Sequence, residues 1–188
     1  SNAPSACTLA TCQPSWLPKN STGVQQPLSS VSRRAGSVPL QRLPLEGLLA
    51  AHQHHILHRD IKPENIKVER LPDGRMQAKI IDFGLAQPPS YEPPTGQRYE
   101  GTLAYSSPEH TGRTSHTLGY RADYYSLGVT LYQLLSGRLP FDSQDAMELV
   151  HSHLARPPDF QLPAFASLPP QLVAVVQRLL EKHPDRRY

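Results

Sequence analysis

A polar motif and a second, acidic motif constrain this chain more than any other part of its sequence. Residues 58–65 read His-Arg-Asp-Ile-Lys-Pro-Glu-Asn, and residues 82–84 read Asp-Phe-Gly. They place two carboxylates, an amide and a lysine at fixed spacing, with Asp60 and Asn65 toward opposite ends of one short loop. Groups arranged in this way can face one phosphate from two sides, so the motifs indicate phosphoryl transfer.

The residues between the two motifs predict a β-hairpin. Ile66–Arg70 and residues 76–82 have the length and composition of short strands, and a Leu-Pro-Asp-Gly turn signal lies between them. The predicted hairpin would carry Asn65 at one end and Asp82 at the other. The polar groups of both motifs would therefore lie close together.

Helical spacing of apolar residues flanks the motifs on both sides. Leu45–Gln53 is expected to form a helix that leads into residues 58–65. Later apolar stretches predict three more helices, over residues 122–136, 142–155 and 170–182. Four prolines predict a mobile loop over residues 86–100. One strand pair followed by helices indicates an α+β fold.

The two motifs resemble the catalytic loop and the metal-binding motif of eukaryotic-type protein kinases. The resemblance implies that Asp60 deprotonates a substrate hydroxyl, that Lys62 faces the transferring phosphate, and that Asn65 and Asp82 hold Mg²⁺. It implies ATP as the cofactor and a protein as the substrate. The ATP-binding residues would be Lys62, Glu64, Asn65 and Asp82, and Thr102 joins Asp60, Lys62 and Asn65 as a catalytic group. Lys62 together with Thr102 points to serine or threonine hydroxyls.

Further motifs carry the same resemblance beyond the catalytic loop. Residues 104–109 look like the end of an activation segment, where Glu109 would form a buried ion pair with Arg187. Residues 123–128 resemble the start of the family's central helix, where Asp123 would accept hydrogen bonds from the backbone of residues 58–59. The residues to which the resemblance gives structural roles are His58, Arg59, Phe83, Gly84, Glu109, Asp123 and Arg187.

A narrower resemblance concerns residues 105–158. They are similar to the kinase-like domain that opens large multidomain hybrid sensor histidine kinases. In those proteins an ATPase-like module, a GAF domain and a histidine kinase follow. Such modules are therefore possible partners in a parent protein.

The N-terminal part of the chain departs from the kinase pattern. Residues 1–37 read as irregular or disordered, and residues 38–188 read as a kinase C-terminal lobe truncated at both ends. No N-terminal lobe is recognisable, because the glycines before His58 form no Gly-rich loop and Lys19 is the sole preceding lysine. We therefore expect this chain alone to be inactive as a kinase.

A second departure is Lys67, which stands where kinases place an apolar residue under the adenine ring, so weak or altered nucleotide binding is expected. The alternative interpretation is a pseudokinase-like module that binds or regulates partners without phosphotransfer.

Two histidine groups are expected on the surface rather than at a metal site. They are His52, His54 and His55 before the catalytic loop, and His151 and His153 near a helix end.

Composition narrows the setting of the protein. The net charge is only +3 and the basic residues are scattered, which argues against binding to nucleic acid or to membrane surfaces. No apolar run approaches the roughly 20 residues of a membrane span. We expect a soluble cytoplasmic protein in which Cys7 and Cys12 are free thiols.

Overall fold

The computed structural model describes residues 45–83, 85–86 and 102–188. The chain divides into two units, Ser1–Pro39 and Leu40–Tyr188, and every described residue belongs to the second. The irregular segment predicted for residues 1–37, Gly84, and all but the first residue of the loop predicted for residues 86–100 lie outside the described part.

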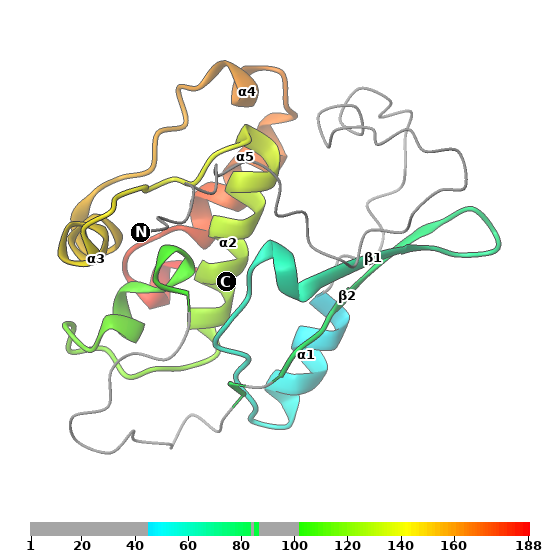
Figure 1. Cartoon of the computed structure of the whole chain (residues 1–188), viewed down its shortest axis with the longest axis horizontal. Helices are drawn as coiled ribbons and strands as arrows, with labels where there is room; N and C mark the ends of the chain where they lie inside the picture. Colours follow the sequence, from blue (N-terminus) through cyan, green and yellow to red (C-terminus); the bar gives the residue numbers. More distant parts are fainter. Residues whose placement is uncertain (1–44, 84, 87–101) are drawn as a thin grey trace, which may run out of the picture. The chain divides into compact units, whose positions relative to one another are not determined.

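The described part is mostly helical, with one two-stranded antiparallel sheet (Figure 1). The helices and strands are α1 (Leu45–Gln53), β1 (Ile66–Arg70), β2 (Met76–Ile80), α2 (Arg121–Ser136), α3 (Ala146–Ala155), α4 (Pro163–Ala166) and α5 (Pro170–Leu179). Short 3₁₀ helices connect them: η2 (Pro63–Asn65), η3 (Leu103–Tyr105), η4 (Pro108–Thr111) and η5 (Pro184–Arg186). The sequence prediction of α1 is confirmed at both ends.

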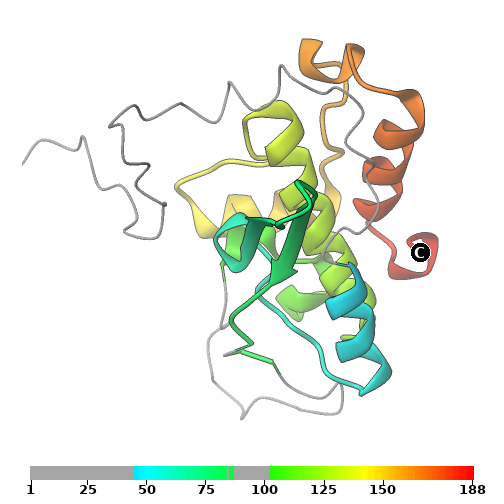
Figure 2. The same cartoon turned by 90° about the vertical axis from the view of Figure 1, so that its right-hand side faces the viewer.

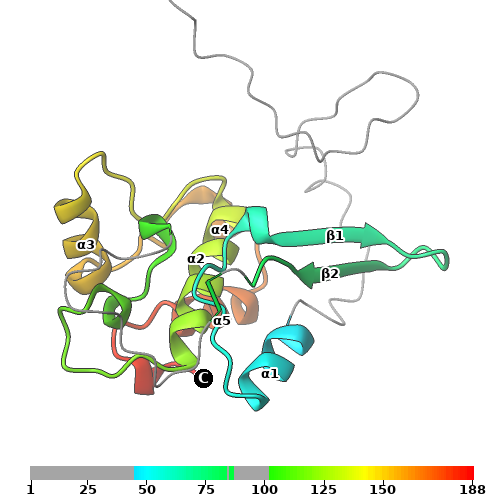
Figure 3. The same cartoon turned by 60° about the horizontal axis from the view of Figure 1, so that its bottom comes forward.

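The β-hairpin forms where the sequence predicts it, but its second strand is shorter. Ile66 pairs with Ile80 and Arg70 with Met76, and Figure 3 shows the two strands running side by side. The prediction that this strand extends to Asp82 is wrong. Asp82 has a φ of 62°, a left-handed conformation that cannot continue an extended strand.

The hydrophobic core forms around α2, which packs against α5 (Figure 2). Tyr125 and Val129 of α2 are fully buried and meet Val176 of α5 in one apolar cluster. Gly128 lets the two helices approach closely, because a Cβ atom there would lie 2.8 Å from the Cβ of Leu179. A second cluster joins α1 to α2 through Leu48, Ile61 and Leu127. The core therefore fixes the loop after α1 against α2.

Capping explains where the predicted helices begin and end. Asp145 accepts a hydrogen bond from the backbone N–H of Met147 (2.8 Å), so α3 begins at Ala146 and not at residue 142. Gly137 adopts a φ of 79° and ends α2. The helix predicted over residues 170–182 ends at Leu179, which leaves Lys182 outside it.

Candidate active site

Asp123 at the start of α2 holds the loop between α1 and η2. Its carboxylate accepts hydrogen bonds from the backbone N–H groups of His58 and Arg59, both at 2.9 Å. Arg59 has a left-handed φ of 68°, which allows consecutive N–H groups to face one carboxylate. These are the hydrogen bonds that the sequence analysis expected of Asp123.

His52 is the residue in this region that the sequence analysis misplaced. Its Nε2 lies 2.8 Å from Oδ2 of Asp123, and its side chain is only 6% exposed. The expectation that His52 lies on the surface is therefore wrong, whereas His54 and His55 are exposed. The helical face of α1 that carries Leu48 also carries His52, four residues later, and this spacing is a signal that sequence reasoning could have used.

Asp60, Lys62 and Thr102 form a compact polar cluster. Nζ of Lys62 lies 2.6 Å from Oδ2 of Asp60 and 2.9 Å from Oγ1 of Thr102. The hydroxyl of Thr102 donates to Oδ1 of Asp60 at 3.2 Å, and its backbone N–H donates to the same atom at 3.3 Å. Lys62 and Thr102 lie 40 positions apart in the sequence, but in the fold both contact the Asp60 carboxylate.

Asn65 faces the same carboxylate from the C-terminal end of η2. Its Nδ2 donates to the backbone oxygen of Asp60 at 2.7 Å and to Oδ2 of Asp60 at 3.1 Å. These bonds fix the orientation of the amide, because Nδ2 must point toward Asp60. The amide oxygen is then the polar side-chain atom of Asn65 that these two bonds do not use.

The pKa of Asp60 reflects two opposing effects. Partial burial acts to raise it, but the hydrogen bond and charge of Lys62, together with the hydrogen bonds from Thr102, lower it below its ordinary value. Asp60 is therefore ionised at neutral pH and available as a hydrogen-bond acceptor.

Asp82 and Phe83 lie just after the hairpin. The N–H of Ile81 donates to the backbone oxygen of Asn65 at 2.9 Å, which brings Asp82 to the end of β1 that carries Asn65. Asp82 itself is exposed. The ring of Phe83 lies 4.6 Å from that of His58, whose Nε2 lies 3.1 Å from the backbone oxygen of Ile81. His58 thus connects the catalytic loop to the second motif.

Glu64 and Lys67 stand apart from this cluster. Glu64 is exposed on η2. Lys67 is exposed on β1, and its Nζ forms an ion pair with Glu69 at 2.8 Å. The ammonium group of Lys67 therefore lies in water beside a carboxylate. A lysine can occupy the position expected under the adenine ring when its charged end is solvated in this way.

Glu109 and Arg187 form a buried ion pair. Two guanidinium nitrogens of Arg187 donate to the two carboxylate oxygens of Glu109, at 2.6 and 3.0 Å, and both side chains are at most 1% exposed. Arg187 also donates to the backbone oxygens of Arg121, Glu181 and Lys182. This pair, which the sequence analysis expected, ties the segment after Thr102 to the C-terminal residues.

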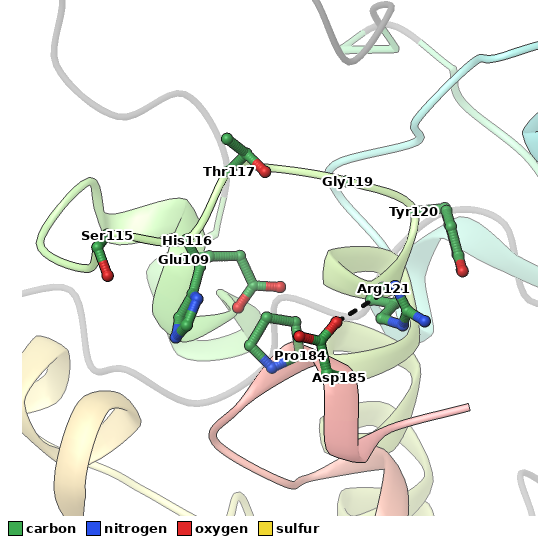
Figure 4. Close-up of a pocket in the computed structure, with 9 residues that line it drawn as sticks. All are labelled: Glu109, Ser115, His116, Thr117, Gly119, Tyr120, Arg121, Pro184 and Asp185. Carbon is green, nitrogen blue, oxygen red and sulfur yellow. Dashed lines mark ion pairs between the residues drawn. The ribbon is translucent and has the colours of Figure 1, made fainter.

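A polar pocket of about 270 Å³ is lined in part by Glu109 (Figure 4). Residues 115–117, 119–121 and 184–185 also line it, and Arg121 lies 3.6 Å from Asp185. None of Asp60, Lys62, Asn65 and Thr102 lines it.

A family model that describes the protein kinase domain matches residues 38–188. The chain belongs to the protein kinase family. The "Hybrid signal transduction histidine kinase G" of Dictyostelium discoideum is 51% identical over 87 residues, which cover 46% of this chain and 2% of that protein. The serine/threonine-protein kinase Pkn1 of Myxococcus xanthus is 36% identical over 145 residues, covering 76% of this chain and 21% of the relative. The serine/threonine-protein kinase PknA of Mycobacterium tuberculosis is 35% identical over 170 residues, covering 87% of this chain and 37% of the relative.

These relatives place the kinase domain among homologues of serine/threonine kinases. The chain spans between 2% and 37% of the length of these three proteins. ATP and magnesium are general requirements of the family.

The donor set of the site fits magnesium bound together with nucleotide phosphates. Among the residues that the structure places, no three His, Cys, Asp or Glu side chains gather as a metal site. Mg²⁺ in kinases is usually held by one or two protein oxygens together with substrate phosphates, and not by an all-protein cage. The Asn65 amide oxygen and the exposed Asp82 carboxylate are groups of the required kind.

In the ranges 45–83, 85–86 and 102–188, no helix has the length and apolar character that crossing a membrane requires.

Proposed function

We propose that this chain is part of a protein kinase domain that transfers the γ-phosphate of ATP to serine or threonine hydroxyls of a protein. The observation that carries the proposal is the arrangement of Lys62, Asn65 and Thr102 around the Asp60 carboxylate. Bound Mg²⁺–ATP would supply the transferable phosphoryl group. The protein residues would position and stabilise the reacting groups, which are the main terms in this chemistry.

Each residue has a role that its contacts favour. Asp60 is ionised and can accept the proton of a substrate hydroxyl, while Lys62 brings a positive charge within reach of a phosphate on the same side. Asn65 and Asp82 would hold the metal, and Asn65 is already fixed by its bonds to Asp60. Thr102 would fix the positions of the Asp60 and Lys62 side chains relative to each other.

The described part corresponds, in our proposal, to the C-terminal lobe of the kinase fold. A helical body with a short hairpin that ends beside Asn65 and Asp82 favours this assignment. The sequence holds no recognisable Gly-rich loop or strand lysine for the nucleotide. We therefore propose that the full-length protein, and not this chain alone, carries out efficient transfer.

The setting of the domain is also a proposal. The similarity to a hybrid signal transduction histidine kinase favours a signalling protein in which ATPase-like, GAF and histidine kinase modules accompany the kinase domain. We place the domain in the cytoplasm, where ATP and protein substrates are present, and we assign it no nucleic-acid partner.

The alternative is a pseudokinase-like module that docks partners without phosphotransfer. Lys67 at the position expected under the adenine ring is the observation that favours it. Calorimetric titration of the full-length protein with ATP, with and without Mg²⁺, separates the two. Magnesium-dependent binding supports the kinase, and absence of ATP binding supports the pseudokinase.

The first prediction tests Asp60 directly. Asp60→Asn in the full-length protein should lower phosphoryl transfer to a protein substrate by about 10² to 10⁴-fold, because an amide cannot accept the hydroxyl proton. Transfer is measured with radiolabelled ATP, and folding is followed by circular dichroism.

Asp73→Asn is the matched control, since Asp73 lies in the exposed hairpin turn, where its carboxylate accepts hydrogen bonds from Arg75. Its transfer rate should equal that of the wild type. Unchanged transfer in Asp60→Asn would remove Asp60 from the role of base.

A further inference from the structure

Three polar side chains from separate parts of the chain meet inside the helical body. They are Tyr125 of α2, His153 of α3, and Lys182 beyond α5. Nζ of Lys182 donates to the hydroxyl of Tyr125 at 3.3 Å, and that hydroxyl lies 3.1 Å from Nδ1 of His153. Tyr125 and His153 are both 0% exposed. The sequence expectation that His153 lies on the surface is therefore wrong.

Lys182 is held in place by more than the tyrosine. Its Nζ also donates to the backbone oxygens of Ser152 at 3.2 Å and His153 at 2.9 Å, in the last turn of α3. Its charge lies over the ring of Phe141, 4.3 Å from the centroid. An ammonium has three hydrogens, and these three acceptors use all of them. Lys182 thus caps the C-terminal end of α3 while it binds Tyr125.

The chemistry of these groups fixes the direction of the hydrogen bonds. A lysine ammonium can only donate, so the oxygen of Tyr125 accepts from it. The single proton of Tyr125 is then donated to His153, and Nδ1 must be the accepting nitrogen. A neutral imidazole with an accepting Nδ1 carries its own proton on Nε2. The geometry therefore assigns the Nε2–H tautomer to His153.

Burial and neighbouring charges lower the pKa values of both His153 and Lys182, and that of His153 stays the lower of the two. Burial, and next the charge of Lys182, lower the pKa of His153 to about 4, so the ring is neutral near pH 7. Burial, and next the charge of Arg187, lower the pKa of Lys182 to about 7. Within the described residues no carboxylate lies at ion-pair distance from Lys182, and Glu109 is engaged by Arg187. Between these two pKa values, Lys182 is charged and His153 is neutral.

The element that carries His153, α3, also packs against η3, the short helix that follows Thr102. Nε2 is buried and has no hydrogen-bonded partner among the described residues, while the backbone of Ala104 interacts with the ring and favours its proton. Ala104 lies in η3, which packs against both α2 and α3, and Thr102 directly precedes η3.

We propose that Lys182, Tyr125 and His153 form a directed hydrogen-bond chain that positions η3, and through it Thr102, against Asp60. His153 is then a positioning residue for the segment on which a protein substrate would rest. The chain transmits the placement of the C-terminal residues to the catalytic cluster, because Arg187 donates to the backbone oxygen of Lys182 and α3, which carries His153, packs against η3. The link between this positioning and catalysis rests on the proposed function, whereas the direction of the hydrogen bonds does not.

The hydrogen-bond direction is tested by ¹⁵N NMR of the histidine rings at a pH between the two pKa values of about 4 and about 7. His153 should show a protonated Nε2 and an unprotonated Nδ1. In Tyr125→Phe the Nδ1 signal should shift, because its donor is gone. Tyr132→Phe is the matched control, since Tyr132 is also a buried tyrosine of α2 but donates to the backbone oxygen of Asp159. A protonated Nδ1 in the wild type would overturn the proposal.

The positioning role is tested by amide hydrogen exchange of residues 103–106. The N–H of Tyr105 donates to Thr102 and that of Ser106 to Leu103, and both should exchange several-fold faster in Tyr125→Phe than in Tyr132→Phe. His153→Gln retains an amide donor near the Nε2 position and should protect these residues better than His153→Leu. Equal exchange in all variants would refute the positioning role, even if the protein has no kinase activity.

The link to the reaction is tested with the full-length protein. Tyr125→Phe should raise KM for the protein substrate several-fold and leave KM for ATP unchanged, because η3 and not the nucleotide site is displaced. Tyr132→Phe should change neither. Equal changes in both KM values would contradict a role specific to the substrate segment. If the wild type shows no transfer, the proposed function fails, and the NMR and exchange results still decide the hydrogen-bond chain.

Discussion

At the scale of single residues, buried carboxylates organise the described fold. Asp123 gathers two backbone N–H groups and His52, and Glu109 binds the guanidinium of Arg187 with both oxygens. A buried charge is stable only when hydrogen bonds replace the lost water, and each carboxylate has several. Each therefore fixes a loop whose own sequence has little tendency to form regular structure.

Glu109→Gln should destabilise the protein by roughly 3 kcal/mol, because it leaves the buried charge of Arg187 without its anion. Three backbone oxygens still accept from Arg187 and limit the loss. The free energy of unfolding in urea measures the effect.

The control for this prediction is Glu69→Gln. Glu69 is also a paired carboxylate, and its partners are Lys67 and Lys79. Unlike the Glu109 pair, all three of these side chains are at least 34% exposed. Solvent screens such pairs, so little change in stability is expected. Equal losses for the two variants would show that burial of the Glu109 pair does not determine its contribution.

At the scale of elements, the contact between α2 and α5 depends on the absence of a side chain. Gly128 lies where a Cβ would meet the Cβ of Leu179 at 2.8 Å and the backbone of that residue at 3.3 Å. Backbone atoms and a Cβ cannot rotate away, so the helices would have to separate. The same contact orders the residues after α5, which supply Lys182 and Arg187.

Gly128→Ala should therefore destabilise the protein by about 1 to 3 kcal/mol despite the better helix propensity of alanine. Gly47→Ala in α1 is the matched control, since Gly47 is exposed and nothing lies within 4 Å of its Cβ position. That variant should gain up to about 1 kcal/mol. Thermal and urea unfolding measure both, and a stabilising Gly128→Ala would contradict the close packing of α2 on α5.

At the scale of the whole molecule, two neutral histidines, the half-buried His110 and the buried His153, make the described body sensitive to acid. Burial, followed by the charge of Arg59, lowers the pKa of His110 to about 4, and burial lowers that of His153 to about 4 as well. Both groups have an ordinary value of 6.5, so the unfolded chain binds more protons than the folded protein between these values.

The free energy of unfolding that depends on these two neutral rings should be at its maximum above about pH 6.5. It should fall as the pH drops toward about 4. The unfolding free energy, measured in urea across this range, should decline by roughly 2 to 3 kcal/mol for the fully buried His153. His110→Gln should flatten part of the decline, and the exposed His151→Gln should not. A flat profile for the wild type would contradict the burial of these rings as neutral groups.

The sequence predicted the local features well because their signals are local. The helix over Leu45–Gln53, the hairpin and the polar motifs depend on spacing, turn residues and residue type, all of which can be read within a few positions. The ends of elements were less accurate. The second strand ends before Asp82 because that residue is left-handed, and α3 begins after Asp145 because that side chain caps it.

The sequence by itself determined the family, the hairpin, the four longer helices and the chemical groups of the candidate site, whereas the short α4 was not predicted. Only the tertiary structure decided that His52 contacts Asp123, that His153 is buried, that Gly128 must lack a side chain, and that Lys182 reaches Tyr125 across 57 positions. The physical reason is that burial and hydrogen-bond partnership depend on which distant elements pack together. A histidine or lysine near a helix end has the same local sequence whether water or another helix covers it.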